Sequence, residues 1–208
     1  MLKELRQASN SYVAIAGHYD ELVEECASLE FIAINAGIAS KQANNDSFMK
    51  LSSEIQIMSS NVTESAHQGR ESAFKCLDST ARSFGQLLSL LRFYGLFDRA
   101  GQQQPKLEPV VDLVRDTIQN FDVGELKRST SNMARSLGNL VALVNIGKTM
   151  AIGGKIKAVY ISGSEEKFRI ITETMQESID RLFELLEHIS MEFGIIQNLF
   201  GNMLGEEV

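Results

Sequence analysis

The first 39 residues repeat apolar or small side chains at a spacing that alternates between three and four residues. One series recurs every seven residues and a second follows it three residues later: Leu5, Tyr12, Tyr19, Cys26 and Ala33, then Ala8, Ile15, Leu22, Leu29 and Ala36. This is the heptad pattern by which α-helices pack side by side in bundles and coiled coils. It predicts one helix over residues 2–39 whose apolar face is buried against other helices.

Helix-breaking residues are rare and gather in one place. The 208 residues include only two prolines, Pro105 and Pro109, and both follow the glycine and glutamine-rich stretch that starts at Gly95. Because proline interrupts helical hydrogen bonding, the remainder of the chain favours long helices. We therefore expect two halves, residues 1–94 and 109–208, with a link at residues 95–108.

Each half contains one polar turn. In the first half the turn is expected near residues 41–46, with Asp46 or Ser47 capping the next helix. In the second half it is expected near residues 152–166, where apolar residues could form a strand-like ribbon or extend the helix, and Ser164 can act as a cap.

The other three helices carry similar stripes. The second helix opens with Phe48, Leu51, Ile55, Met58 and Val62. Its stripe then weakens between Ser65 and Ser72, which predicts a loosened, polar side, and resumes in a shifted phase, as at a coiled-coil skip: Phe74, Leu77, Ala81, Phe84, Leu88 and Leu91. The third stripe is Val110, Val114, Phe121, Leu126, Thr130, Met133, Leu137, Leu140, Val144, Gly147 and Ala151. The fourth is Phe168, Ile171, Met175, Leu182, Leu185, Ile189, Ile196, Leu199 and Met203, widened by Ile179, Leu186, Phe193 and Phe200.

Helices of about 35–45 residues cannot bury such stripes within one hairpin, since each hairpin would leave one apolar face open. Two antiparallel hairpins packed together bury all four stripes. The predicted fold is therefore all-α, an elongated antiparallel four-helix bundle or coiled coil made of two long helical hairpins.

Charge and cysteine content limit the function. The formal net charge of −7 argues against a nucleic-acid surface. No apolar run reaches the ~18 residues of a membrane span, and the first residues do not form a signal peptide, so we expect a cytoplasmic protein. In the first hairpin Cys26 would lie opposite residue 58 and Cys76 opposite residue 8, too far apart for a disulfide.

The first tip resembles the cytoplasmic signalling domain of methyl-accepting chemotaxis receptors. Where that family reads roughly Asn-Ala-Ala-Ile-Glu-Ala, this chain has Asn35 to Ser40, and where the outgoing helix reads Phe-Ala-Val-Val-Ala-x-Glu-Val, it has Phe48 to Ile55. The chain differs at Ala39, where the family has a glutamate, and its turn lacks the Gly-Glu-x-Gly-Arg-Gly sequence.

The resemblance implies a non-enzymatic signal-transduction module that binds other proteins. Its partners would be signalling proteins, such as the chemotaxis kinase and its coupling protein, and a homo-oligomer is left open. The residues carried over as a partner-binding tip are Asn35, Ile38, Phe48 and Glu54, together with Asn145 from the second tip.

The second hairpin echoes the first. Asn145 and Gly147 align with Asn35 and Gly37 at an offset of 110, and Phe168 aligns with Phe48 at an offset of 120. These offsets suggest a duplicated hairpin with an insertion in its second turn.

Particular residues suggest other functions. His67 and Arg70 lie in a segment similar to the histidine phosphotransfer motif, with His67 as the phosphate acceptor and Arg70 holding the charge. A plain scaffold bundle and a helical pore-forming protein are further alternatives. His18, His67 and His188 lack a neighbouring ligand at metal spacing, so neither a metal nor a cofactor is expected, and no catalytic site.

Overall fold

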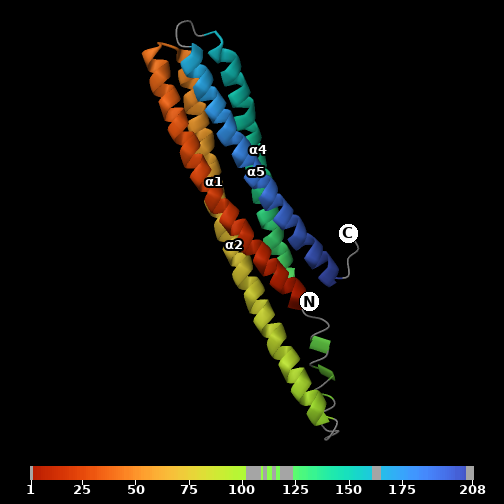
Figure 1. Ribbon diagram of the computed structural model, residues 1–208. Coiled ribbons are helices and arrows are strands. Elements are labelled where there is room, and N and C mark those ends of the chain that lie inside the picture. Colours follow the sequence, from red (N-terminus) through yellow and green to blue (C-terminus); the bar gives the residue numbers. More distant parts are fainter. Residues whose placement is uncertain are drawn as a thin grey trace.

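The computed structural model describes residues 2–101, 109, 112–113, 116–117, 124–160 and 165–204. Within this part of the chain four long helices form an elongated bundle (Figure 1). Their bounds are α1 Leu2–Gln42, α2 Asp46–Gly101, α4 Gly124–Ala158 and α5 Glu165–Leu204. The predicted all-α fold of two antiparallel hairpins in one bundle is confirmed.

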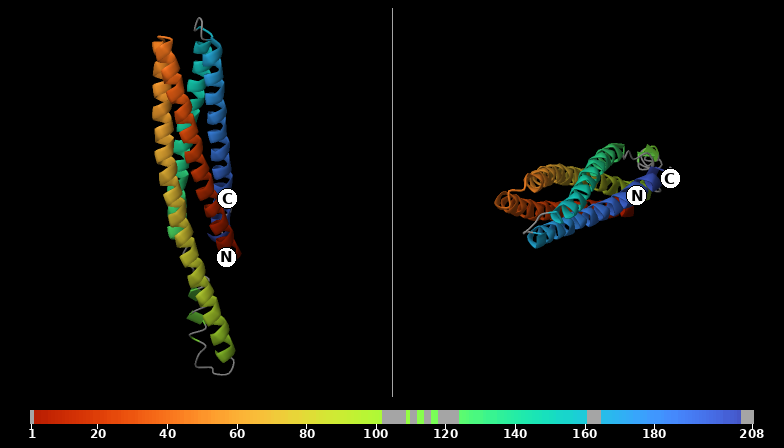
Figure 2. Two further views of the ribbon diagram at one scale, coloured as in Figure 1. Left: turned by 60° about the vertical axis from the view of Figure 1, so that its left-hand side comes forward. Right: turned by 90° about the horizontal axis from the view of Figure 1, so that it is seen from above.

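The helices form a ring in which every neighbour is antiparallel. Backbones approach closely between α1 and α2, α2 and α4, α4 and α5, and α5 and α1. The described parts of the diagonal pairs, α1 with α4 and α2 with α5, have no such approach. The turns that follow α1 and α4 lie at one end, here called the closed end, and the opposite end of α2 runs past the start of α1 (Figure 2).

Helices α2 and α4 both extend beyond their predicted ends. Helix α2 continues through Gly95 to Gly101, so the expected break at residue 95 is wrong; a single glycine costs a helix only about 1 kcal/mol. Helix α4 continues to Ala158, which selects the helical extension over a strand-like ribbon. Residues 102–108 of the expected link, most of the early third stripe and Ser164 lie outside the described residues.

The predicted stripe of α1 forms the core. All ten heptad residues from Leu5 to Ala36 are fully buried. From Thr130 to Ala151 in α4 and from Phe168 to Leu199 in α5 the predicted seams are buried as well, with Ile171 and Leu185 of α5 only partly covered. Apolar and small side chains at heptad spacing thus identified three of the four seams.

The predicted phase shift in α2 is wrong. Its buried seam continues unbroken through small residues, Ala66, Gly69 and Ala73, to Cys76, while Phe74 is largely exposed. The seam is small at this level because the rings of Tyr12 and Tyr19 of α1 fill the space. A Cβ on Gly69 would lie 2.7 Å from the Tyr19 hydroxyl oxygen, so this side of α2 is closely packed and not loosened.

Two serine hydroxyls hold the register of the first hairpin. Ser52 of α2 donates a hydrogen bond to the backbone carbonyl of Ala33. One heptad further along α2, Ser59 donates to the carbonyl of Cys26 at 2.7 Å. Cys26 therefore lies opposite Ser59, close to the predicted position, whereas Cys76 contacts Tyr12, about 21 Å away along the axis of α1 at ~1.5 Å per residue. Both cysteines are buried, and both are free, as the predicted distance between them requires.

The first turn is built by two asparagines. Asn44 has φ 52°, its N–H bonds to the carbonyl of Lys41, and the N–H of Asn45 bonds to the carbonyl of Ser40. This pair of bonds is a Schellman motif, in which a left-handed residue ends a helix. The Asn45 side chain then accepts a bond from the N–H of Phe48 at 3.0 Å and caps α2. Asn45 therefore takes the capping role that the sequence suggested for Asp46 or Ser47.

Two phenylalanines join the hairpins across the bundle. The ring centroids of Phe48 in α2 and Phe168 in α5 are 4.4 Å apart, and both side chains are fully buried. Such aromatic pairs contribute about 0.5–1.5 kcal/mol beyond their burial. The offset of 120 relates the buried seams of α2 and α5 along their length, from Phe48 and Phe168 to Thr80 and Phe200.

The corresponding offset between α1 and α4 is not the predicted 110. Tyr12 and Ser40 occupy the positions in the α1 seam that Thr130 and Ala158 occupy in α4, an offset of 118, and the hydroxyls of Tyr12 and Thr130 meet across the bundle. Gly147 is consequently buried in the core, where a Cβ would lie 2.7 Å from the Met58 terminal carbon. The sequence alignment of Asn145 with Asn35 therefore does not correspond to equivalent positions in the bundle.

Substitution of Asn44 tests the turn. We expect Asn44→Gly to leave stability unchanged or slightly raised, because glycine adopts positive φ without strain. Asn44→Val is expected to lower the free energy of unfolding by about 1–2 kcal/mol, since a β-branched residue is disfavoured there. Urea unfolding followed by circular dichroism gives both values; equal stability of the two variants would contradict the left-handed turn.

Substitution of Gly69 tests the small seam. We expect Gly69→Ala to destabilise the bundle by about 1–3 kcal/mol, because the new methyl group collides with Tyr19. The matched control is Gly85→Ala, which meets no atom within 4 Å and should gain about 0.5–1 kcal/mol from helix propensity. In a double variant, Tyr19→Leu should recover part of the Gly69→Ala loss. Similar effects at both glycines would show that the seam is not closely packed.

Candidate functional site

The residues predicted for a partner-binding tip do not form one cluster. Phe48 lies in the core against Phe168, so it supports the closed end from inside. Asn35 and Ile38 are exposed on α1, whereas Asn145 is exposed on α4, the helix diagonally opposite. Glu54 of α2 is partly exposed and pairs with Lys50 at 3.8 Å. Only the exposed residues of this set are available to a partner.

Apolar side chains mark the outer face of α1 near the closed end. Phe31, Ile34 and Ile38 are spaced at i, i+3 and i+7 and therefore share one helix face. Phe31 is 65% exposed and Ile38 is 53% exposed, although residues 31–40 contain no charged side chain. Helix α2, packed beside α1, adds the exposed residue Met49, which lies about 60° around the helix from Ser52 on the side toward α1. These four residues are called the α1–α2 apolar face.

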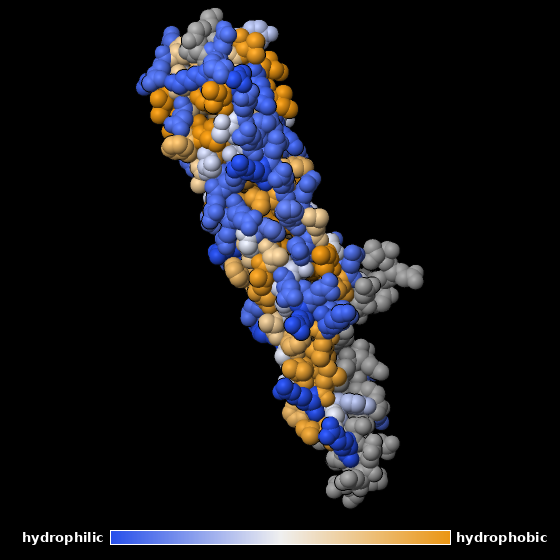
Figure 3. Space-filling model, in the orientation of Figure 1, coloured by the Kyte–Doolittle hydropathy of each residue, from blue (hydrophilic) through white to orange (hydrophobic). Residues whose placement is uncertain are grey.

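The surface near the closed end is divided by polarity. Figure 3 shows apolar atoms on both flanks of that end and a band of hydrophilic atoms between them. Ile152 and Ile156 are exposed in the last turns of α4, and Val159 and Tyr160 are exposed directly after its end. The two apolar areas therefore lie on different helices.

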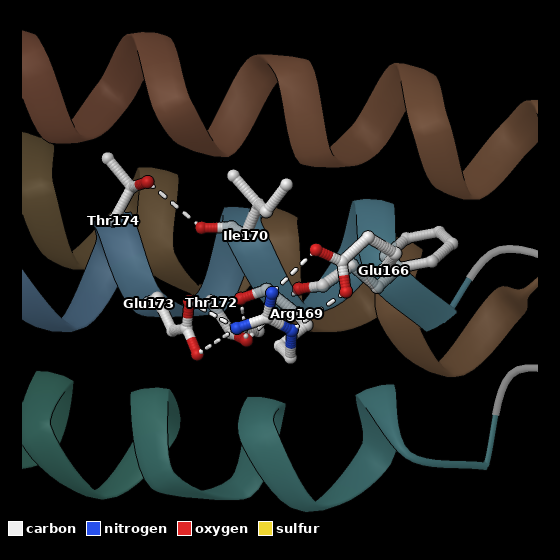
Figure 4. A network of polar contacts seen from close by, with 7 residues as sticks. Glu166, Arg169, Ile170, Thr172, Glu173 and Thr174 are labelled. Carbon is white, nitrogen blue, oxygen red and sulfur yellow. Dashed lines mark hydrogen bonds and ion pairs between the residues drawn. The ribbon is translucent and has the colours of Figure 1, made fainter.

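A hollow with charged walls lies between α4 and α5 at the closed end. Its volume is about 360 Å³ and its lining includes Lys155, Val159 and Arg169. Figure 4 shows Arg169 between Glu166 and Glu173, to which its guanidinium donates bonds of 2.5–3.0 Å. The bond from Arg169 lowers the pKa of Glu166 and raises the pKa of the guanidinium. This cation is already matched by two carboxylates, so it is not free to bind an anion.

The two residues of the phosphotransfer alternative, His67 and Arg70, differ in their environment. His67 is exposed on α2, as an acceptor must be. Arg70, however, contacts Asp20 of α1 at 2.8 Å through Nε and lies 5.2 Å from the centre of the Phe74 ring. Its charge is paired with a carboxylate, so it does not offer a free cation beside His67.

A histidine pair between α1 and α5 was missed in the sequence. The rings of His18 and His188 are 5.4 Å apart, and His18 Nδ1 lies 3.3 Å from a carboxylate oxygen of Glu21. Beside them, Arg181 of α5 pairs with Glu25 of α1 at 3.7 Å. The residues that meet here depend on the register between the first and last helices, which no local pattern indicates.

Among the described residues no three His, Cys, Asp or Glu side chains come together as a metal site would require. Nor does any described helix combine enough length and apolar character to cross a membrane.

Comparison of the chain with models of protein families, with curated proteins and with solved structures found no match.

Two buried tyrosines carry ionisable hydroxyl groups in the core. The hydroxyls of Tyr12 and Thr130 share a hydrogen bond of 2.6 Å across the bundle. One heptad further along α1, the Tyr19 hydroxyl is buried and makes no hydrogen bond to a described residue. Burial raises the pKa of Tyr19 to about 12 and that of Tyr12 above its usual range as well.

Replacing each tyrosine by phenylalanine should give opposite results. At pH 7 we expect Tyr12→Phe to cost about 1 kcal/mol of stability, because the hydrogen bond between the Tyr12 and Thr130 hydroxyls is lost. Tyr19→Phe removes an unpaired hydroxyl from the core and should be neutral or stabilising. Urea unfolding at pH 7 measures both; an equal loss in the two variants would contradict the difference in hydrogen bonding.

The same tyrosines make stability depend on alkaline pH. A pKa raised in the folded state above the unfolded value of ~10 means that stability is full below pH ~10 and is lost as pH rises toward about 12. Loss of helical circular dichroism should therefore accompany the tyrosinate absorbance change in this window. Tyr19→Phe should move the alkaline midpoint to higher pH, and an unchanged midpoint would count against ionisation of Tyr19 as a cause.

Proposed function

We propose that this chain is a non-enzymatic signal-transduction module, similar to the cytoplasmic domain of chemotaxis receptors, that binds partner proteins through the α1–α2 apolar face. The observation that carries the proposal is the exposure of Phe31, Ile34 and Ile38 on a stretch of α1 without charge. The core is filled without these side chains, so their apolar character is not needed for folding. Exposed apolar patches of this kind commonly mark protein interaction sites.

The partner contact proposed for this chain differs from that of the chemotaxis receptors that the chain resembles. Ala39, which stands where the family has a tip glutamate, is buried, and so is Ser40 beside it. Ser40 donates to the carbonyl of Ala36 within its own helix, so its hydroxyl is used internally. The proposed contact is therefore apolar, with Asn35 as an exposed hydrogen-bonding group among the apolar side chains.

Binding to chemotaxis proteins tests the proposal. The purified chain is immobilised, and association of the chemotaxis coupling protein and kinase is measured by biolayer interferometry. We expect binding that the double variant Phe31→Ser, Ile38→Ser weakens by about tenfold or more, since buried aromatic and aliphatic contacts commonly contribute over 1 kcal/mol each.

The matched control is Val13→Ser, Met191→Ser, two substitutions at side chains that are 56% and 60% exposed and lie outside this face. The control should bind like the unmodified chain, and both double variants should retain the same thermal unfolding midpoint. Lack of binding by the unmodified chain to either protein would contradict a chemoreceptor-like role. Equal loss in both variants would contradict the assignment to the α1–α2 apolar face.

A further inference from the structure

The closed end of the bundle is cationic although the chain as a whole is acidic. The segments that build this end, residues 36–50 and 152–172, contain six Lys or Arg and three Asp or Glu. The formal charge of the entire chain is −7, so its negative charge resides elsewhere. Such a polarised rod presents one end to an anionic surface and repels that surface along its shaft.

Two of the cations at this end that form no ion pair with a described residue lie on α4, and the others are Lys41 of α1 and Lys167 of α5. Lys155 and Lys157 are exposed in its last turn, and no described residue forms an ion pair with either. Three carboxylates line the hollow with Lys155: Glu166 and Glu173 are held by Arg169, and Glu165 forms no ion pair with a described residue. The two lysines are therefore free to meet an external negative charge.

Apolar side chains accompany these lysines. Ile152, Ile156 and Val159 are spaced at i, i+4 and i+7 on the outer side of α4, and Tyr160 follows them. Val159 is 71% exposed and Tyr160 is 82% exposed. The stripe extends about 10 Å along the helix axis, similar to the ~5–10 Å depth at which interfacial helices bury apolar side chains. These four residues with Lys155 and Lys157 are called the α4 end patch.

We propose that the α4 end patch docks the bundle end-on to an anionic lipid surface without crossing it. Aliphatic side chains and a tyrosine would enter the interfacial region, while Lys155 and Lys157 would contact lipid phosphates and carboxylates. An apolar stripe with free lysines at the extreme end of a rod favours a lipid surface over an acidic protein, because lysine stems can extend to head groups while the stripe is buried. The α1–α2 apolar face is on other helices and stays available to a protein partner.

A tryptophan reporter tests the docking. The chain contains no tryptophan, so Tyr160→Trp places a single reporter in the α4 end patch. Vesicles of phosphatidylcholine with about 30% phosphatidylserine should bind the protein and shift the emission of this reporter to shorter wavelength, whereas pure phosphatidylcholine should not. Raising the salt to about 0.5 M should weaken binding, because the attraction is electrostatic.

Charge and apolar variants then locate the contact in vesicle flotation assays. Lys155→Glu, Lys157→Glu should weaken binding to the anionic vesicles by at least about tenfold, and Ile156→Ser, Val159→Ser by a similar factor. The matched charge control is Lys3→Glu, Arg6→Glu. It changes the net charge by the same amount at the start of α1, far from the closed end, and should bind to the anionic vesicles like the unmodified chain. The apolar control is Val13→Ser, Met191→Ser.

Three results would overturn the inference. The first is equal binding, or none, to the two vesicle compositions. The second is equal loss in the charge variant and its control. The third is retention of the protein by an immobilised acidic polypeptide without vesicle binding, which would assign the cationic end to a protein partner. None of these results bears on binding by the α1–α2 apolar face, so this inference and the proposed function fail separately.

Discussion

The contact between Tyr19 and Gly69 determines how the first two helices pass each other. The ring of Tyr19 occupies the volume that a side chain on residue 69 would need. Along this part of the bundle α2 contributes Ala66, Gly69 and Ala73, so bulk must come from α1 and from α5, whose seam carries leucine, isoleucine and phenylalanine at the corresponding positions. Any sliding of α1 along α2 would drive the tyrosine rings into backbone or leave voids, both of which are costly in a packed core.

Much of the fold could be predicted because helix-forming patterns are local. The alternating spacing in α1 is complete, and every residue it selects is buried. The pattern failed in α2 because it assigns large apolar residues to the core, whereas glycine and alanine fill the seam opposite large rings. The same assignment placed Phe74 in the core, whereas its side chain is exposed beside Arg70. The sequence did not predict that Asn45 caps α2 or that Asn44 adopts the left-handed conformation, because several neighbouring residues could equally serve as caps.

The candidate site was harder to predict than the fold. A motif aligned by residue type does not separate the side of a helix that faces the core from the side that faces solvent. Phe48 matched the motif and is buried, whereas Phe31 lies outside it and is exposed. Contacts between α1 and α5, such as that of His18 with His188, depend on how two distant helices are aligned. That alignment is set by packing throughout the bundle, so it appears only once the helices are assembled.

The heptad spacing shared by all four helices restricts how the length of this bundle can change. Ser52 and Ser59 bond to carbonyls one heptad apart. The buried seams of α2 and α5 keep a constant offset in residue number from the closed end toward the opposite end of the bundle. A deletion in one helix would rotate every later side chain away from its partners unless it removed a whole heptad. Even then, the antiparallel neighbours would need the same deletion at the same level. Length variants of this protein should therefore differ by matched heptads in all four helices, with the closed end preserved.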